Sequence, residues 1–71
     1  MWIEFNGALF KLEDIIYILK EDITADYGTP LYQLSIITQN KTFTKRYAHS
    51  RDGYMEREKH YNQFKDILFK N

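Results

Sequence analysis

The dipeptide Asn6-Gly7 constrains the fold of this chain more than any other feature of its sequence. It separates two short segments, residues 2–5 and 8–12, in which apolar side chains recur at alternate positions. A two-residue type I′ turn needs positive φ at both central positions, and Asn and Gly tolerate that conformation best. The dipeptide therefore predicts a β-hairpin. Its expected cross-strand pairs are Phe5 with Ala8, Ile3 with Phe10 and Met1 with Leu12.

The predicted hairpin has two unlike faces, because successive side chains of a strand point to opposite sides. The face that carries Phe5 is apolar. The opposite face is mixed, and its residues are Trp2, Glu4, Leu9 and Lys11. The place where the rest of the chain packs decides which of the two faces is buried.

Three further strands are predicted after the hairpin. Residues 15–20 are rich in β-branched and aromatic residues and carry apolar side chains on both faces, which suits a strand covered on both sides. Residues 22–30 are polar and predict a loop. Residues 31–38 and 42–47 alternate around a short polar turn and predict a second hairpin. Its expected pairs are Ile36 with Phe43, Leu34 with Lys45 and Tyr32 with Tyr47.

The period of the apolar residues changes to that of an α-helix from about Asp52 to Lys70. Ser50 or Asp52 can cap the first turn through a side-chain oxygen. Since Gly53 is a poor residue for a helix interior, we expect the regular helix to begin near Tyr54. The apolar stripe of the helix consists of Tyr54, Tyr61, Phe64, Ile67 and Leu68.

Together these elements predict an α+β fold, an antiparallel sheet of about five strands with one amphipathic C-terminal helix packed on one face. Residues 1–71 form a single domain, in which residues 1–47 are the antiparallel meander and residues 52–70 the helix. Such a helix is roughly 25 Å long and can cover one face of a small sheet. The pattern does not decide which face it covers.

The second face of the sheet would keep exposed apolar side chains, and large apolar patches are uncommon on soluble monomers. We therefore expect a homodimer, a higher oligomer or a dedicated protein partner. The candidate interface residues are Trp2, Leu9, Tyr17 and Leu19.

The chain of 71 residues contains no cysteine, so a disulfide framework, a thiol nucleophile and a thiolate metal site are excluded. Its first residues lack a basic segment followed by an apolar run. No segment approaches the roughly 20 apolar residues that span a bilayer. These features favour a cytoplasmic protein without a membrane partner.

Charge is distributed unevenly along the chain, although ten basic and ten acidic residues give a net charge of zero. Residues 1–36 are predominantly acidic, and residues 37–71 are predominantly basic. The basic half also contains aromatic residues, so it has the components of a nucleic-acid-binding groove. Because zero net charge weakens attraction to phosphates, nucleic acid is the less favoured partner.

The passage from the last strand into the helix is the candidate site for an anionic ligand. Arg46, Tyr47, His49 and Arg51 lie there. The adjacent helix N-terminus offers free N–H groups and a dipole that favour phosphate or carboxylate. The same residue types also occur in purely structural strand-to-helix connections. No Gly-rich phosphate loop is present, and no cofactor is predicted.

No catalytic or metal site is predicted. Glu56 and His60 share a helical face, but a catalytic zinc generally has three protein ligands, and the sequence supplies no third. His49, Ser50 and Asp52 are neighbours on one short segment, which seldom gives the alignment that a catalytic triad requires. We therefore expect a protein that is not an enzyme.

The order of these features resembles that of small single-domain proteins of bacterial and phage genomes, most of them without an assigned activity. The resemblance rests on Phe5-Asn6-Gly7, on Leu12-Glu13-Asp14-Ile15, and on the alternating hairpin followed by an amphipathic C-terminal helix. It covers the whole chain as an architecture. Because the matching positions are turn and core residues, it implies no functional residue.

The sequence thus predicts a non-catalytic protein-binding module, such as a small phage or mobile-element inhibitor of a larger host protein. The first alternative is an oligomeric protein that sequesters a small anionic ligand such as a nucleotide. The second alternative is nucleic-acid binding through the basic C-terminal half.

Overall fold

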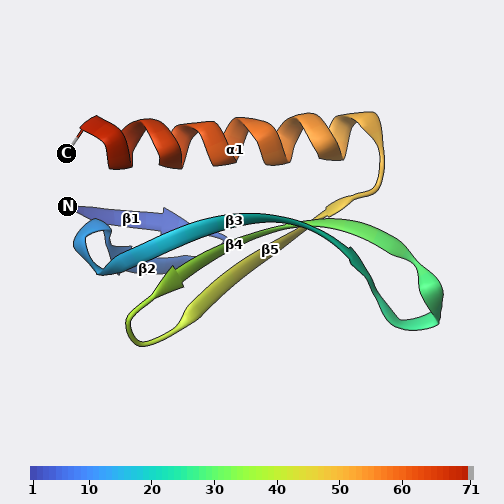
Figure 1. Cartoon of the computed structure of the whole chain (residues 1–71), viewed down its shortest axis with the longest axis horizontal. Coiled ribbons are helices and arrows are strands. Elements are labelled where there is room, and N and C mark those ends of the chain that lie inside the picture. Colours follow the sequence, from blue (N-terminus) through green and yellow to red (C-terminus); the bar gives the residue numbers. More distant parts are fainter. Residues whose placement is uncertain (71) are drawn as a thin grey trace.

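Alternating apolar residues build antiparallel strands, and an apolar period of 3.6 residues builds a helix after them (Figure 1). The computed structural model describes residues 1–70. Its strands are β1 (Trp2–Phe5), β2 (Ala8–Lys11), β3 (Ile15–Thr24), β4 (Pro30–Thr38) and β5 (Thr42–Ala48), and its helix is α1 (Arg51–Lys70). Two short 3-10 turns are η1 (Leu12–Asp14) and η2 (Asp26–Gly28). The predicted α+β fold with a C-terminal helix on antiparallel strands is confirmed.

Asn6 and Gly7 form the turn of the first hairpin, with φ angles of 51° and 83°. β1 and β2 pair in the predicted register, which sets Phe5 opposite Ala8. The Asn6 side chain also contacts β5, because its Nδ2 donates a hydrogen bond to the Thr44 carbonyl oxygen at 3.1 Å. The turn therefore helps to fix the hairpin against the second half of the chain.

The strands form two sheets and not one continuous meander. β1 and β2 pair with each other, whereas β3, β4 and β5 form a three-stranded sheet in that order. Turn η1 separates β2 from β3, and the buried Leu12 side chain anchors this turn in the interior. The first hairpin therefore packs against the three-stranded sheet through its side chains and does not extend it.

β3 and β4 form a longer hairpin than the sequence predicts. β3 continues to Thr24 and stays paired with β4 to its end. The irregular connection is therefore residues 25–29 and not residues 22–30. The polar end of β3 is held in the strand because Asp22 accepts a hydrogen bond from Arg57 of α1 at 2.8 Å. In Figure 1 this hairpin extends beyond the first turn of α1.

β4 and β5 pair in the predicted register. Ile36 stands opposite Phe43, Leu34 opposite Lys45 and Tyr32 opposite Tyr47. Thr38 closes the turn between the two strands, since its Oγ1 donates to the Lys41 carbonyl oxygen at 2.6 Å. The alternation of this segment is therefore sufficient to specify its pairing.

Helix α1 covers the sheet face that carries Phe5, the choice that the sequence left open. The buried cluster joins both sheets to the helix, and its members are Phe5, Phe10, Leu34, Ile36, Tyr47 and Phe64. The rings of Phe5 and Phe64 meet edge to face, with centroids 5.3 Å apart. Phe10 stacks on Phe43 of β5 at 4.6 Å. A single apolar core thus holds the three parts of the fold together.

Helix α1 begins at Arg51, earlier than the predicted start near Tyr54. Ser50 caps the first turn, as predicted, because its Oγ accepts a hydrogen bond from the Gly53 N–H at 3.1 Å. This turn passes very close to β5. A Cβ atom at position 53 would lie 1.9 Å from the Ala48 carbonyl oxygen. Gly53 is therefore required for the close approach, which outweighs its low helix propensity.

The buried stripe of α1 runs through Gly53, Arg57 and Phe64. Tyr54, which the sequence placed on this stripe, is 45% exposed. Arg57 occupies the stripe instead and is 5% exposed. The apolar pattern missed this shift because a glycine and an arginine fill two positions that usually carry apolar side chains.

Candidate functional site

Trp2 and Leu9 lie on the outer face of the first hairpin, on the side that does not enter the core. We call this surface, together with Glu4 and Lys11, the hairpin face. Trp2 is 63% exposed and Leu9 is 66% exposed. Lys11 Nζ lies 5.6 Å from the centre of the Trp2 ring, within range of a weak cation–π contact. The hairpin face therefore presents large apolar side chains that the core does not use.

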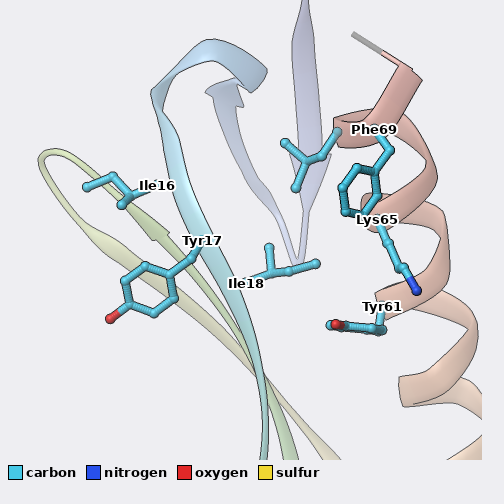
Figure 2. Close-up of a pocket in the computed structure, with 7 residues that line it drawn as sticks. Ile16, Tyr17, Ile18, Tyr61, Lys65 and Phe69 are labelled. Carbon is cyan, nitrogen blue, oxygen red and sulfur yellow. The ribbon is translucent and has the colours of Figure 1, made fainter.

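Tyr17 and Leu19 lie on a different surface, the face of β3 that α1 does not cover. Figure 2 shows Tyr17 pointing away from α1 and Ile18 pointing toward it. Tyr17 and Leu19 are both exposed. The four candidate interface residues therefore lie on two sheets. Tyr17 and Leu19 belong to the three-stranded sheet, whereas Trp2 and Leu9 belong to the two-stranded sheet of the first hairpin.

Tyr47, a candidate anion-binding residue, belongs to the core. Its hydroxyl oxygen lies 2.8 Å from Nδ1 of His60. Burial raises the pKa of Tyr47 to about 12, and the Glu56 carboxylate adds to the rise. Burial, followed by the nearby Lys45 ammonium, lowers the pKa of His60 below its usual value. Both side chains are therefore neutral at neutral pH and are hydrogen-bonded to each other inside the protein.

The other candidate anion-binding residues have different surroundings. Arg46 is exposed and points to the opposite side of β5 from Tyr47, since neighbouring strand residues alternate. His49 stacks on Tyr32, with ring centroids 4.5 Å apart. Arg51 is the exposed first residue of α1. The four residues therefore do not converge on one position, and the Tyr47 hydroxyl is already used within the core.

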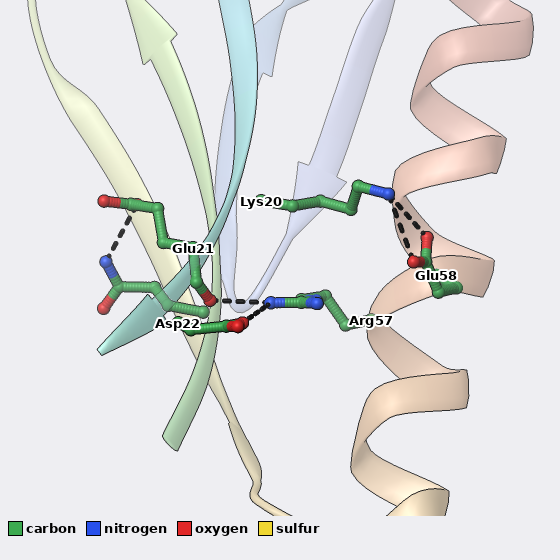
Figure 3. A network of polar contacts seen from close by, with 6 residues as sticks. Lys20, Glu21, Asp22, Arg57 and Glu58 are labelled. Carbon is green, nitrogen blue, oxygen red and sulfur yellow. Dashed lines mark hydrogen bonds and ion pairs between the residues drawn. The ribbon is translucent and has the colours of Figure 1, made fainter. Parts of the chain in front are cut away.

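Arg57 is a charged residue of structural consequence that sequence reasoning did not single out. Its Nη1 donates hydrogen bonds to the Glu21 carbonyl oxygen at 2.6 Å and to Asp22 Oδ1 at 2.8 Å (Figure 3). The guanidinium carbon lies 4.6 Å from the centre of the Tyr32 ring and 5.5 Å from that of Tyr54. These contacts make Arg57 a link between α1 and the β3–β4 hairpin, although its buried Nε has no hydrogen-bond partner within residues 1–70.

The position of Arg57 could have been found from helical spacing. It follows Gly53 by four residues and precedes Phe64 by seven, which places all three on one face of a helix. Gly53 would have indicated this face, because a glycine allows the backbone of a helix to approach another element closely. Here the first turn of α1 approaches Ala48 of β5.

Lys20 and Glu58 form a second link between β3 and α1. Lys20 Nζ lies 3.1 Å and 3.0 Å from the two Glu58 carboxylate oxygens (Figure 3). The same ammonium lies 4.4 Å from the centre of the Tyr61 ring. The hydrogen bond from Lys20 lowers the pKa of Glu58. Since both residues are partly exposed, solvent screens this pair, and it guides orientation more than it adds stability.

Neither a metal-binding cluster nor a membrane-spanning helix is found among the described residues. Within residues 1–70, no three His, Asp or Glu side chains are gathered in a way that could hold a metal ion. His60 Nδ1 faces the Tyr47 hydroxyl, and Glu56 lies 3.7 Å from Lys45 Nζ. In the same part of the chain, no helix has the length and apolar character needed to cross a membrane.

Comparison of the chain with protein-family models, with curated proteins and with solved structures gives no match. The candidate surfaces are therefore ranked by their geometry. Among them, the hairpin face combines exposed aromatic and aliphatic side chains with a backbone that the core holds in place.

Proposed function

We propose that this chain is a non-catalytic protein-binding module that docks onto a larger protein through the hairpin face. The observation that carries the proposal is the position of Trp2 and Leu9. Trp2 pairs with Lys11 and Leu9 pairs with Glu4, so Trp2 and Leu9 are diagonal neighbours on one face of the hairpin. Both are largely exposed.

The composition of the hairpin face supports protein binding. Tryptophan is among the residues that contribute most to binding energy at protein interfaces. Leu9, which is 66% exposed, extends the apolar surface beside it. Glu4 and Lys11 add charge of both signs, and charged residues are typical of the rim of an interface.

The rigidity of the hairpin also supports this function. The inner side chains Phe5 and Phe10 are buried in the core, and Asn6 is hydrogen-bonded to β5. The outer side chains are therefore presented on a backbone that is already ordered. A surface ordered before binding loses less conformational entropy when it meets a partner.

The ionisable groups support binding over catalysis. Tyr47 and His60, whose pKa values are displaced by burial, face each other in the core and do not line an open cleft. Arg57, the buried cation, is already hydrogen-bonded to β3. The anion-binding alternative is less favoured, because the Tyr47 hydroxyl is hydrogen-bonded within the core.

The proposal is tested by capturing proteins from a lysate of the source cells on three immobilised versions of the chain. These are the wild type, the double variant Trp2→Ala with Leu9→Ala, and Met55→Ala. Met55 is a matched control, because it is an exposed apolar residue on α1, away from the hairpin face. We expect a protein that the wild type and Met55→Ala retain and the double variant loses.

The captured protein is then purified and titrated calorimetrically with each version. We expect the double variant to bind at least tenfold more weakly, about 1.4 kcal/mol, while Met55→Ala binds like the wild type. Equal affinity of the double variant and the wild type would overturn the proposal, as would the absence of any protein that distinguishes them.

A further inference from the structure

β3 forms an open edge of the three-stranded sheet. It is ten residues long, and no described strand pairs with its outer side. The other edge strand, β5, is approached by the first hairpin, because Asn6 donates a hydrogen bond to the Thr44 carbonyl oxygen. An open edge is a template for a further strand, and native proteins usually blunt or cover long edges. We therefore expect another element to cover the unpaired backbone groups along the β3 edge.

The regular open part of the β3 edge is short. A β-bulge interrupts the register just before Tyr17. At the other end, Arg57 donates a hydrogen bond to the Glu21 carbonyl oxygen at 2.6 Å (Figure 3). A strand of another chain can therefore form a regular antiparallel pair with β3 only along residues 17–20, the segment that contains Ile18.

A groove lies beside this edge, between the start of β3 and the last turns of α1 (Figure 2). Its volume is about 380 Å³, and the residues that matter here are Ile16, Ile18, Tyr61, Lys65, Leu68 and Phe69. Ile16 is 60% exposed and Phe69 is 81% exposed. The open edge and this apolar groove together form one surface, which we call the β3 groove.

We propose that a second copy of this chain covers the β3 groove, with the two β3 strands paired antiparallel about a twofold axis at Ile18. The two three-stranded sheets then join into one sheet of six strands. The two α1 helices lie antiparallel on the same side of it and close the groove between them. A twofold dimer of this kind presents the same patch of both copies to each other.

The position of the axis follows from the pairing rules of antiparallel strands. Residues directly opposite each other share a face of the sheet, so a twofold axis normal to the sheet passes through a residue position. An axis at Leu19 would set Tyr17 against Glu21, whose carbonyl oxygen Arg57 already occupies. An axis at Ile18 sets Tyr17 of one copy against Leu19 of the other. Two exposed apolar side chains are thereby paired on each side of the axis.

Charge on α1 is complementary under the same symmetry. Tyr61 lies across the groove from Ile18, so the axis passes near it. Glu58 and Lys65 are equally far from the midpoint between residues 61 and 62. Antiparallel helices related by this axis therefore bring Lys65 of each copy toward Glu58 of the other, whose carboxylate also accepts hydrogen bonds from Lys20 of its own chain. Unlike charges meet, which favours a second copy over an unrelated strand.

The area requirement explains why the helices take part. A standard interface removes about 800 Å² from each partner. This is roughly one sixth of the 5113 Å² surface of the chain. Pairing along residues 17–20 alone is too small, whereas Leu68 and Phe69 beside the same groove add apolar area. Strand pairing and helix contact therefore form a single interface.

The proposal is tested by sedimentation equilibrium of the wild type at several concentrations, with Leu19→Lys, Phe69→Glu and Trp2→Ala alongside. Circular dichroism confirms that each variant is folded. We expect a wild-type dimer that dissociates on dilution, and dimerisation at least about tenfold weaker for Leu19→Lys and Phe69→Glu. Trp2→Ala should dimerise like the wild type, because the hairpin face is a separate surface. The dimer and the proposed function therefore fail independently.

Cysteine cross-linking tests the register, since the natural chain contains no cysteine. A mixture of Tyr17→Cys and Leu19→Cys chains should form a disulfide-linked dimer faster than either variant alone, because these positions stand opposite each other across the axis. A wild-type monomer at every concentration would overturn the proposal and leave the edge to a strand of another protein. Faster cross-linking of Leu19→Cys with itself would also overturn it, since that result places the axis at Leu19.

Discussion

Nη1 of Arg57 donates a hydrogen bond to the backbone carbonyl oxygen of Glu21 at 2.6 Å, and this contact joins α1 to the edge strand β3. The Arg57 side chain is almost fully buried, whereas the side chain of its ionic partner, Asp22, is 75% exposed. Solvent therefore screens the ion pair on one side. Packing of the guanidinium between Tyr32 and Tyr54 and its hydrogen bond to the backbone make up the larger part of its contribution.

Arg57→Ala should therefore destabilise the protein by about 2–3 kcal/mol. Arg57→Met should cost less, about 1 kcal/mol, because it keeps the apolar stem between the two tyrosines and removes a buried charge. Urea denaturation measures both values. Lys59→Ala, an exposed helix position, is the control and should change stability by less than about 0.5 kcal/mol. Equal losses for the alanine and methionine variants would contradict this account.

Gly53→Ala should destabilise the protein although alanine is the better helix former. Propensity alone predicts a gain of about 1 kcal/mol. The new Cβ atom would lie 1.9 Å from the Ala48 carbonyl oxygen, so the first turn of α1 must move away from β5. We expect a net loss of at least about 2 kcal/mol in thermal or urea unfolding. Asn62→Ala, at an exposed helix position, should instead be slightly stabilising. A stabilised Gly53→Ala variant would refute the close approach.

The free energy of unfolding should decrease as the pH falls, over a pH range set by the pKa of His60. Burial holds the pKa of His60 below its ordinary value of 6.5, so the unfolded chain binds this proton more readily than the folded chain. The free energy of unfolding should therefore decrease as the pH falls below about 6.5.

His60→Gln removes this titration and should flatten the pH dependence of stability between neutral pH and a pH of about 5. The lowered pKa values of Glu13 and Glu58 act with the same sign, but below the ordinary carboxylate value of 4.5, so the two ranges are separable. Urea denaturation at a series of pH values measures the effect. An unchanged slope in the variant would show that another group titrates there.

Trp2→Ala and Phe5→Ala should differ strongly in their effect on folding. Phe5 faces α1 and Phe64 in the core, so its truncation should cost about 3–5 kcal/mol. Trp2 lies on the opposite face of the same strand and is exposed, so its truncation should cost less than about 0.5 kcal/mol. Thermal unfolding of both variants checks the difference. A strongly destabilised Trp2→Ala variant would show that the hairpin face is covered within the folded chain.

Local patterns predicted the parts of the fold that depend on neighbours in sequence. Asn6-Gly7 specified the first hairpin and its register, because positive φ at two adjacent positions admits one turn type. The alternation of residues 31–47 specified the second hairpin in the same way. For the candidate sites, the sequence identified Trp2, Leu9, Tyr17 and Leu19 as unused apolar residues, and all four are exposed.

Contacts between residues far apart in the sequence determined the other features of the fold. The strands separate into two sheets at turn η1, where the Leu12 side chain is buried in the folded chain. The length of β3 depends on Arg57, which lies 35 residues away from its partner Asp22. The anion-binding residues adjoin in sequence, yet the core takes Tyr47 and leaves Arg46 on the surface. No local pattern contains these pairings.

The amino-acid sequence by itself thus determined the turns, the strand registers and the existence of the helix, because these depend on φ preferences and on side-chain periods along a short segment. The tertiary structure alone decided which hairpin face α1 buries. Phe5 and Phe64 meet in the core, and this leaves Trp2 on the outside. The physical reason is that the burial of a side chain depends on all the elements that pack around it. A face of the hairpin therefore stays exposed to solvent only where no other element packs against it.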